Sequence, residues 1–132
     1  MLNLESDIYT YLKSLAYSYD VTVRRANRKL TPVYPMITIQ EIDNSTSVAI
    51  HGTEKRSNIS YQIDVFAKDY YPDSAQTVCN TLATEIDSSI QSEYGLLRKS
   101  AVNIPDPNDD RVARTTLRYG GILDTVNEYI YH

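Results

Sequence analysis

Cysteine, glycine and long apolar runs are scarce in this 132-residue chain, and each shortage excludes a kind of protein. The single cysteine, Cys79, can form neither an intramolecular disulfide nor a multi-cysteine metal site. The four glycines, Gly52, Gly95 and the pair Gly120-Gly121, are too scattered for a phosphate-binding loop. No apolar run approaches the roughly 18 residues of a membrane span, and no basic segment followed by an apolar run opens the chain. We therefore expect a soluble, unprocessed protein with no membrane contact.

Histidine is also scarce, and acidic residues outnumber basic ones. The two histidines are His51, in a polar stretch, and His132, the last residue, so a histidine-based catalytic or metal site has little to draw on. The segment Asp106–Asp110 lacks the later glycine and glutamate of a calcium loop, and we interpret it as a turn. A net charge of −4 disfavours a general nucleic-acid-coating protein. We therefore expect no enzyme activity, no metal and no cofactor.

The central feature is a long strand that leads into an amphipathic helix, between Lys55 and Ser92. From Asn58 to Ala67, apolar and polar residues alternate with the period of two that is typical of a strand. Asp64 and Lys68 fall on its polar side, and we interpret them as solvated charges. Apolar residues then recur at helical spacings of three and four, at Ala75, Val78, Cys79, Leu82, Ala83, Ile86 and Ile90. The two apolar faces are expected to pack together, with Cys79 as a small buried side chain.

The flanking segments complete the pattern of one α+β domain spanning 1–132. Asp73, with Gln76 three residues on, predicts the start of the central helix, and Gly95 predicts its end. A first helix is expected from Asn3, as its cap, to about Ser18. Further strands are expected at Val21–Val23, Met36–Ile42, Leu96–Ile104, Arg111–Asp124 and Tyr129–Tyr131. This order predicts a two-layer fold, a mostly antiparallel sheet with two main helices on one face.

Two segments interrupt this pattern. The polar stretch Asp43–Arg56 is typical either of a long loop or of an extension of the flanking strands, and we predict a loop that contacts a partner. Its candidate contact residues are His51, Glu54 and Arg56. The pair Gly120-Gly121 predicts a bulge or a close approach of another part of the chain.

Arginines and tyrosines supply the remaining candidate interface. Twelve tyrosines against one phenylalanine and no tryptophan suit a protein that assembles, because tyrosine combines a large apolar ring with a polar tip. Arg114 and Arg118 fall on one face of the late strand, which is typical either of a solvated face or of a subunit or nucleic-acid contact. The other candidates are Arg24, Arg25 and Arg28, before the second strand, and Tyr70, Tyr71, Tyr129 and Tyr131.

The order and spacing of several segments resemble the tail terminator, or tail completion, proteins of long-tailed bacteriophages and prophages. The resemblance covers most of the chain after about residue 20. It rests on Tyr34-Pro35-Met36-Ile37-Thr38-Ile39, on SNISYQIDVFAK at 57–68 with the helix that follows, on Ile104–Asn108, on Arg114 and Arg118-Tyr119, and on Ile130-Tyr131. The polar stretch 43–56 is where the chain departs from the family.

The resemblance implies a structural virion protein, assembled in the host bacterial cytoplasm. Such a protein forms a homo-oligomeric ring, a hexamer, that caps the head-proximal end of the tail tube. Its partners would be the major tail tube protein and the head–tail connector proteins, and genomic DNA would pass through the ring without specific binding. Two alternatives stay open: a head completion or connector protein, and a small nucleic-acid-binding protein that uses the arginine-bearing sheet face.

Overall fold

The computed structural model describes residues 4–25, 34–50, 54–69, 74–105, 112–124 and 129–131, with side chains described at 6–25, 34–42, 59–69, 74–104 and 112–121. Along the chain the elements are α1 (Leu4–Ser14), β1 (Thr22–Arg25), β2 (Met36–Ile50), β3 (Glu54–Lys68), α2 (Ala75–Tyr94), β4 (Leu97–Pro105), β5 (Val112–Asp124) and β6 (Tyr129–Tyr131). Every one of these strands belongs to a single sheet.

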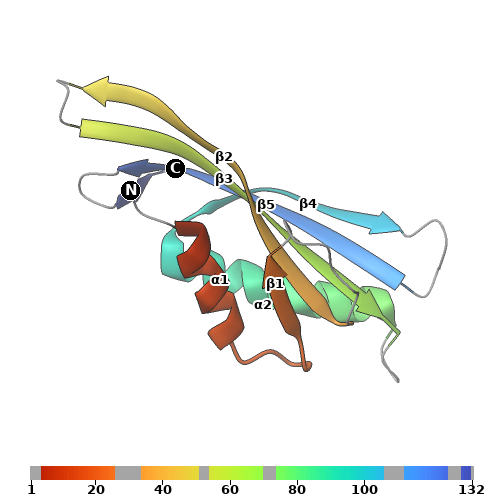
Figure 1. Ribbon diagram of the computed structural model, residues 1–132. Coiled ribbons are helices and arrows are strands. Elements are labelled where there is room, and N and C mark those ends of the chain that lie inside the picture. The colour runs from red at the N-terminus through yellow and green to blue at the C-terminus, as the bar shows by residue number, and fades with distance from the viewer. Residues whose placement is uncertain are drawn as a thin grey trace.

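The sheet runs in the order β1-β2-β3-β5-β4, and β6 pairs with the far end of β5. Only β1 and β2 are parallel, and the other pairs are antiparallel. Both helices lie on the same face of the twisted sheet, α2 beneath the central strands and α1 beside it, next to β1 (Figure 1). The predicted α+β fold, a mostly antiparallel sheet with two helices on one face, is confirmed.

The core forms where the apolar sides of β3 and α2 meet, as their periodicities predict. On β3 the buried residues are Ile59, Tyr61, Ile63, Val65 and Ala67, and on α2 they are Ala75, Val78, Cys79, Leu82, Ile86 and Ile90. Neighbouring strands contribute Ile37, Ile39, Leu117 and Tyr119, and α1 contributes Ile8 and Leu12. Burial of these side chains is the main source of stability.

The helix ends differ in part from the sequence prediction. Helix α2 begins one residue later than expected, because Ser74 and not Asp73 is its cap, with the Ser74 hydroxyl accepting from the Thr77 amide at 3.3 Å. Its predicted end is confirmed, since Gly95 has a φ of 66° and donates its amide to the Gln91 carbonyl. Helix α1 ends at Ser14, four residues before the predicted end.

The predicted loop at 43–56 is wrong for most of its length. Strand β2 continues to Ile50 and β3 begins at Glu54, so the flanking strands extend into a long hairpin. Pairing runs from Asp43 opposite Ser60 to Ile50 opposite Glu54, interrupted by two irregularities in β2. Backbone hydrogen bonds to a neighbouring strand stabilise this extension although its side chains are poor strand formers.

Strand β5 passes through the glycine pair without a bulge. Gly120 lies opposite Ser60 and Gly121 opposite Ile59, with no shift of register. The irregularity lies in the neighbouring strand, between Arg98 and Ser100. The predicted close approach is present, because a Cβ on Gly120 would lie 3.2 Å from the Lys99 Cε atom. A larger residue at this position would displace the Lys99 side chain.

Candidate interaction surface

The face of the sheet opposite the two helices, here called the outer face, carries a buried polar network centred on Asp64. The Asp64 side chain is buried on β3 and accepts from the Thr116 hydroxyl at 2.6 Å and from the Gln62 amide at 3.0 Å. Arg114 completes an ion pair with the same carboxylate at 3.3 Å. A buried carboxylate is tolerated when its charge and its acceptor oxygens are satisfied in this way. The interpretation of Asp64 as a solvated charge is therefore wrong.

The two predicted arginines of β5 both belong to this network. Arg114 lies over the Phe66 ring, 5.2 Å from its centroid, as well as against Asp64. Arg118 is exposed, and its Nε atom donates to the Gln62 Oε1 atom at 3.2 Å. The two residues share one face of the strand, as their spacing predicts, but Arg114 is held by an internal carboxylate. Of these two arginines, Arg118 therefore contributes more to the positive charge of the outer face.

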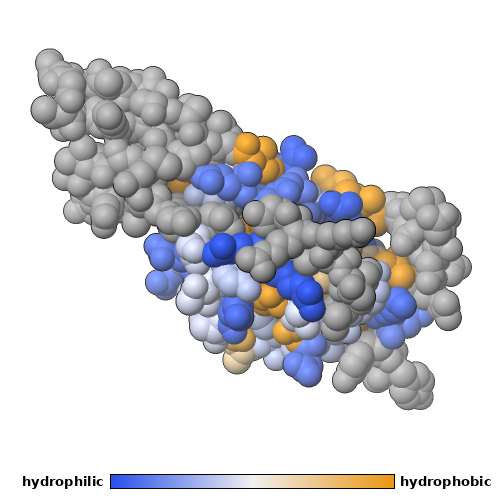
Figure 2. All heavy atoms as spheres, in the orientation of Figure 1, coloured by the Kyte–Doolittle hydropathy of each residue, from blue (hydrophilic) through white to orange (hydrophobic). Residues whose placement is uncertain are grey.

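Strand β4 borders this network and forms an edge of the sheet that no other described strand covers. Among its described side chains, Leu97 to Ile104, all but Ser100 are exposed. Leu97, Val102 and Ile104 point to the outer face, since their partners on β5 are Gly120, Thr116 and Arg114. The space-filling view shows hydrophobic surface along the upper margin of the molecule, on the side where β4 lies in Figure 1 (Figure 2). An exposed apolar edge strand is a common site of protein association.

The arginines of β1 divide between the two faces. Arg25 turns toward α1, where its guanidinium donates to the Ser6 hydroxyl at 2.6 Å and lies 4.8 Å from the centroid of the Tyr9 ring. Arg24 pairs with Thr38 and so falls on the outer face. The two residues predicted as one cluster therefore have different surroundings, and Arg25 serves the packing of α1.

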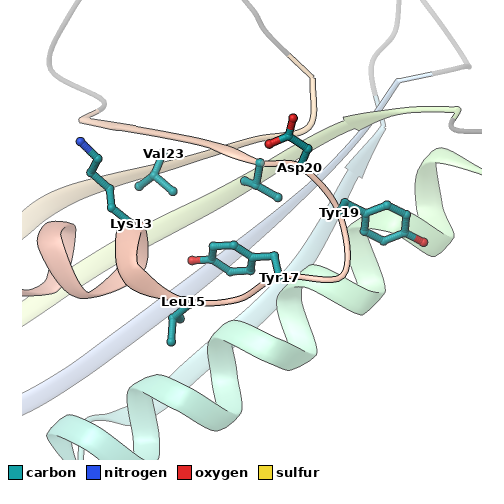
Figure 3. A pocket seen from close by; sticks show the side chains of 7 residues that line it. Lys13, Leu15, Tyr17, Tyr19, Asp20 and Val23 are labelled. Atoms are coloured by element: carbon teal, nitrogen blue, oxygen red, sulfur yellow. The ribbon is translucent and has the colours of Figure 1, made fainter.

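A small pocket lies between the end of α1 and β1 (Figure 3). It has a volume of about 200 Å³ and is lined by Lys13, Leu15, Tyr17, Tyr19, Asp20, Val21 and Val23. The Tyr17 hydroxyl is already bonded to the Leu12 carbonyl at 2.6 Å, and burial, together with Glu85, raises the pKa of Tyr17. Figure 3 shows the charged ends of Lys13 and Asp20 pointing away from that hydroxyl. The lining groups do not converge on a common point, so the pocket makes a poor ligand site.

The remaining ionisable groups with shifted pKa values serve the interior. Cys79 is fully buried, its thiol donates to the Val65 carbonyl at 3.5 Å, and burial raises its pKa to about 11. The prediction that Cys79 is a buried small side chain is confirmed. Burial also raises the pKa of Tyr119, whose hydroxyl donates to Asp87 at 2.8 Å. Asp87 in turn binds Arg98 at 3.2 Å and so links α2 to β4.

Several predicted contact residues lie outside the described part of the chain. Arg28, His51, Tyr70 and Tyr71 fall outside the described residues, and only the backbone is described at Glu54, Arg56, Tyr129 and Tyr131. Sequence reasoning missed the apolar residues of β4 and the network carboxylate. A signal for Asp64 was present, because a strand acid facing two strand arginines across a sheet suggests an ion pair.

The described residues contain no group of three or more His, Cys, Asp or Glu side chains that could hold a metal ion. Within the same ranges, no helix is long and apolar enough to cross a membrane. A scan against protein-family models and a search of curated proteins both find no match to the chain. The arrangement of the outer face and of the β4 edge is therefore the main guide to function.

Proposed function

We propose that the chain is a structural subunit of a bacteriophage virion, which assembles as a ring at the head-proximal end of the tail tube and joins the tail to the head connector. The proposal combines the resemblance in the order of segments after residue 20 with one structural observation. That observation is the apolar β4 edge, where Leu97, Val102 and Ile104 are 43%, 50% and 38% exposed.

The β4 edge supports an assembly function because such a surface is costly in a free monomer. Apolar side chains gain roughly 25 cal/mol for each Å² removed from water, and an open edge strand offers unpaired backbone groups to a second strand. A ring subunit needs surfaces of this kind on opposite sides, since each copy contacts two neighbours through different patches.

The internal pairing of the arginines favours protein contacts over binding of nucleic acid. Arg114 is neutralised by Asp64 at 3.3 Å, and Arg118 donates to Gln62. A nucleic-acid surface would instead present several uncompensated cations to phosphates. Among the described cations of the outer face, Arg24, Lys68 and Arg118 have no described carboxylate partner, and Lys68 lies over the Tyr34 ring. We therefore favour the assembly function over a small nucleic-acid-binding protein.

The decisive experiment is deletion of the gene from the phage or prophage that encodes it, followed by electron microscopy of the lysate. We expect filled heads and separate tails, with joining restored when the wild-type chain is supplied from a plasmid. Normal joined particles without the protein would exclude the proposal. Purified tails incubated with the protein should carry a ring of density at one end, which gives both position and stoichiometry.

Two further measurements separate the alternatives. A head completion or connector protein would copurify with heads, whereas the proposed protein copurifies with tails. A nucleic-acid-binding protein would shift duplex DNA at low ionic strength and lose this binding steeply as salt is added. We expect no such shift.

A further inference from the structure

The four large hydrophobic side chains that the described part of the chain leaves exposed all lie at the two edges of the sheet. Leu97, Val102 and Ile104 belong to β4, at one edge. Ile42, which is 45% exposed, belongs to β2 at the opposite edge, just beyond the stretch that β1 covers. Two apolar edges on opposite sides of one sheet are what a head-to-tail contact between identical subunits requires.

Each edge has a stretch that no described strand covers. On β4 this stretch is Ser100–Ile104, which contains no charged residue and lies between the irregularity at Lys99 and Pro105. Charged residues, bulges and prolines are the usual protection of an edge strand, so this stretch is unprotected. At the opposite edge, β1 covers β2 only from Met36 to Ile39, and beyond it β2 has no described outer neighbour.

The strand directions allow the two edges to pair. From β2 to β4 the sheet contains four strands, each antiparallel to the next, and β1 is parallel to β2. A second copy placed beside the first in the same orientation therefore presents its β1 and β2 antiparallel to β4. The helices of both copies then lie on the same side of a continuous sheet, so the addition can repeat.

The register places complementary side chains at the same level on the two edges. One row across the sheet runs from Arg98 on β4 through Tyr119 and Tyr61 to Glu41 on β2. Its two ends are therefore the basic Arg98 and the acidic Glu41. Both are exposed. When β4 of one copy pairs with β1 of the next, Arg98 lies at the level of Glu41 and Leu97 at the level of Ile42, each about 10 Å away because β1 is the outermost strand.

The charges of β4 and β2 agree with this arrangement, whereas β1 carries Arg24 and Arg25, of which Arg25 is turned toward α1. Strand β4 contains Arg98 and Lys99 and no acid, whereas β2 contains Glu41 and Asp43 and no base. Complementary charges accelerate association and disfavour the wrong partner edge. Pairing of β4 with β4 of a second copy would instead bring like charges together.

We propose that β4 of one copy pairs with β1 of a second copy, at the edge that also exposes Gln40–Ile42 of β2, so that the sheets of neighbouring subunits become continuous. The proposal rests on the proposed ring and adds which surfaces meet in it. The contact is heterologous, because each copy contributes a different edge. This geometry produces a ring or an open chain and not a closed dimer.

Cysteine cross-linking tests the contact, and the chain is well suited to it. Its single cysteine, Cys79, is fully buried and its pKa is raised, so it will not compete with introduced thiols. Purified Val102→Cys and Arg24→Cys variants, which replace the two ends of one row across the sheet, are mixed, oxidised and run on a non-reducing gel. We expect dimer from the mixture, little from either variant alone, and a ladder of higher oligomers from the double variant.

The control pair keeps Val102→Cys and replaces the second position by Ser88→Cys, an exposed site on α2. Docking raises the local concentration of the two thiols, so the test pair should cross-link roughly tenfold faster than this control. Ile104→Cys with Thr22→Cys, the two ends of another row, provides a second test pair. Equal rates in test and control pairs, or dimer from Val102→Cys alone at the rate of the mixture, would overturn the proposal.

The outcomes also distinguish this proposal from the function on which it rests. A ring on isolated tails without preferential cross-linking would refute the edge contact and leave the proposed function standing. Preferential cross-linking with no ring on tails and no joining defect on deletion would support the contact and refute the function.

Discussion

The Thr116 hydroxyl on β5 donates to the Asp64 carboxylate on β3 across 2.6 Å, at the centre of the sheet. Both side chains are buried on the face away from the helices. They lie in a row that runs across the whole sheet, from Val102 on β4 through Thr116, Asp64 and Thr38 to Arg24 on β1. The network therefore holds together β3 and β5, the strands that carry β2 and β4 on either side. A change that weakens the network should thus affect both the stability of the fold and the shape of the candidate surface.

Removal of the network carboxylate should destabilise the protein more than removal of an exposed acid. Asp64→Ala leaves Thr116, Gln62 and Arg114 without their acceptor, and we expect a loss of about 2–4 kcal/mol in the free energy of unfolding. Asp64→Asn keeps an acceptor and should lose less. Urea unfolding of these variants, beside an exposed Glu93→Ala control, measures the difference. Equal stability of Asp64→Ala and the control would contradict the structural role of the network.

The sequence predicts the core elements well because their apolar patterns are regular and local. Strand β3 alternates with a period of two, and α2 carries one continuous stripe that includes Cys79. The extension of β2 to Ile50 is the alternative to the predicted loop, which its polar residues favour. Its stability depends on pairing with β3, which is a tertiary effect that local propensity does not register.

The candidate surface was harder to predict than the fold. Arg114 and Arg118 were identified from their spacing, but their partners Asp64 and Gln62 are 50 to 56 positions away in the chain and meet them only through the strand register. The exposure of β4 depends on which strand forms the edge of the sheet, and this order cannot be obtained from the alternation of one segment. Both properties arise from topology, whereas residue patterns report mainly local structure.

The C-terminal cap of α2 gives a separate test of the helix end. Gly95 has a φ of 66°, a conformation that is unfavourable for residues with a Cβ. Gly95→Ala is expected to lower the free energy of unfolding by about 1 kcal/mol. Gly95→Asn should lower it less, because asparagine tolerates the left-handed conformation better. Thermal or urea unfolding of wild type and both variants measures these differences in stability. An unchanged stability in Gly95→Ala would contradict the observed cap.

The buried thiol predicts a loss of stability at alkaline pH. Burial raises the pKa of Cys79 from 9.0 to about 11, so the unfolded chain releases the proton at a lower pH than the folded protein. Its contribution to stability is complete below pH 9 and is lost as the pH rises through about 11. Across this window the difference in unfolding free energy between wild type and Cys79→Ala should shrink by on the order of 1–3 kcal/mol. The tyrosines are present in both proteins, so the effect of their ionisation cancels in this difference. A difference in unfolding free energy that does not change with pH would contradict the prediction.

A charge substitution tests the electrostatic part of the edge contact. Glu41→Lys places a base at the level of Arg98 of the neighbouring copy, and we expect association to weaken by roughly two- to fivefold per contact, as for an exposed ion pair. Wild-type association should also fall as salt is added, whereas the variant should depend less on salt. Sedimentation velocity over a concentration series measures both effects.

The matched variant is Glu41→Lys combined with Arg98→Glu, which exchanges the two charges and should recover part of the lost association. Because Arg98 also binds Asp87 at 3.2 Å within its own subunit, the unfolding free energy of the double variant must be measured alongside. Recovery of association together with a lower subunit stability would separate the contact between copies from the internal ion pair. Equal association in wild type, single and double variants at low salt would show that Glu41 and Arg98 do not meet.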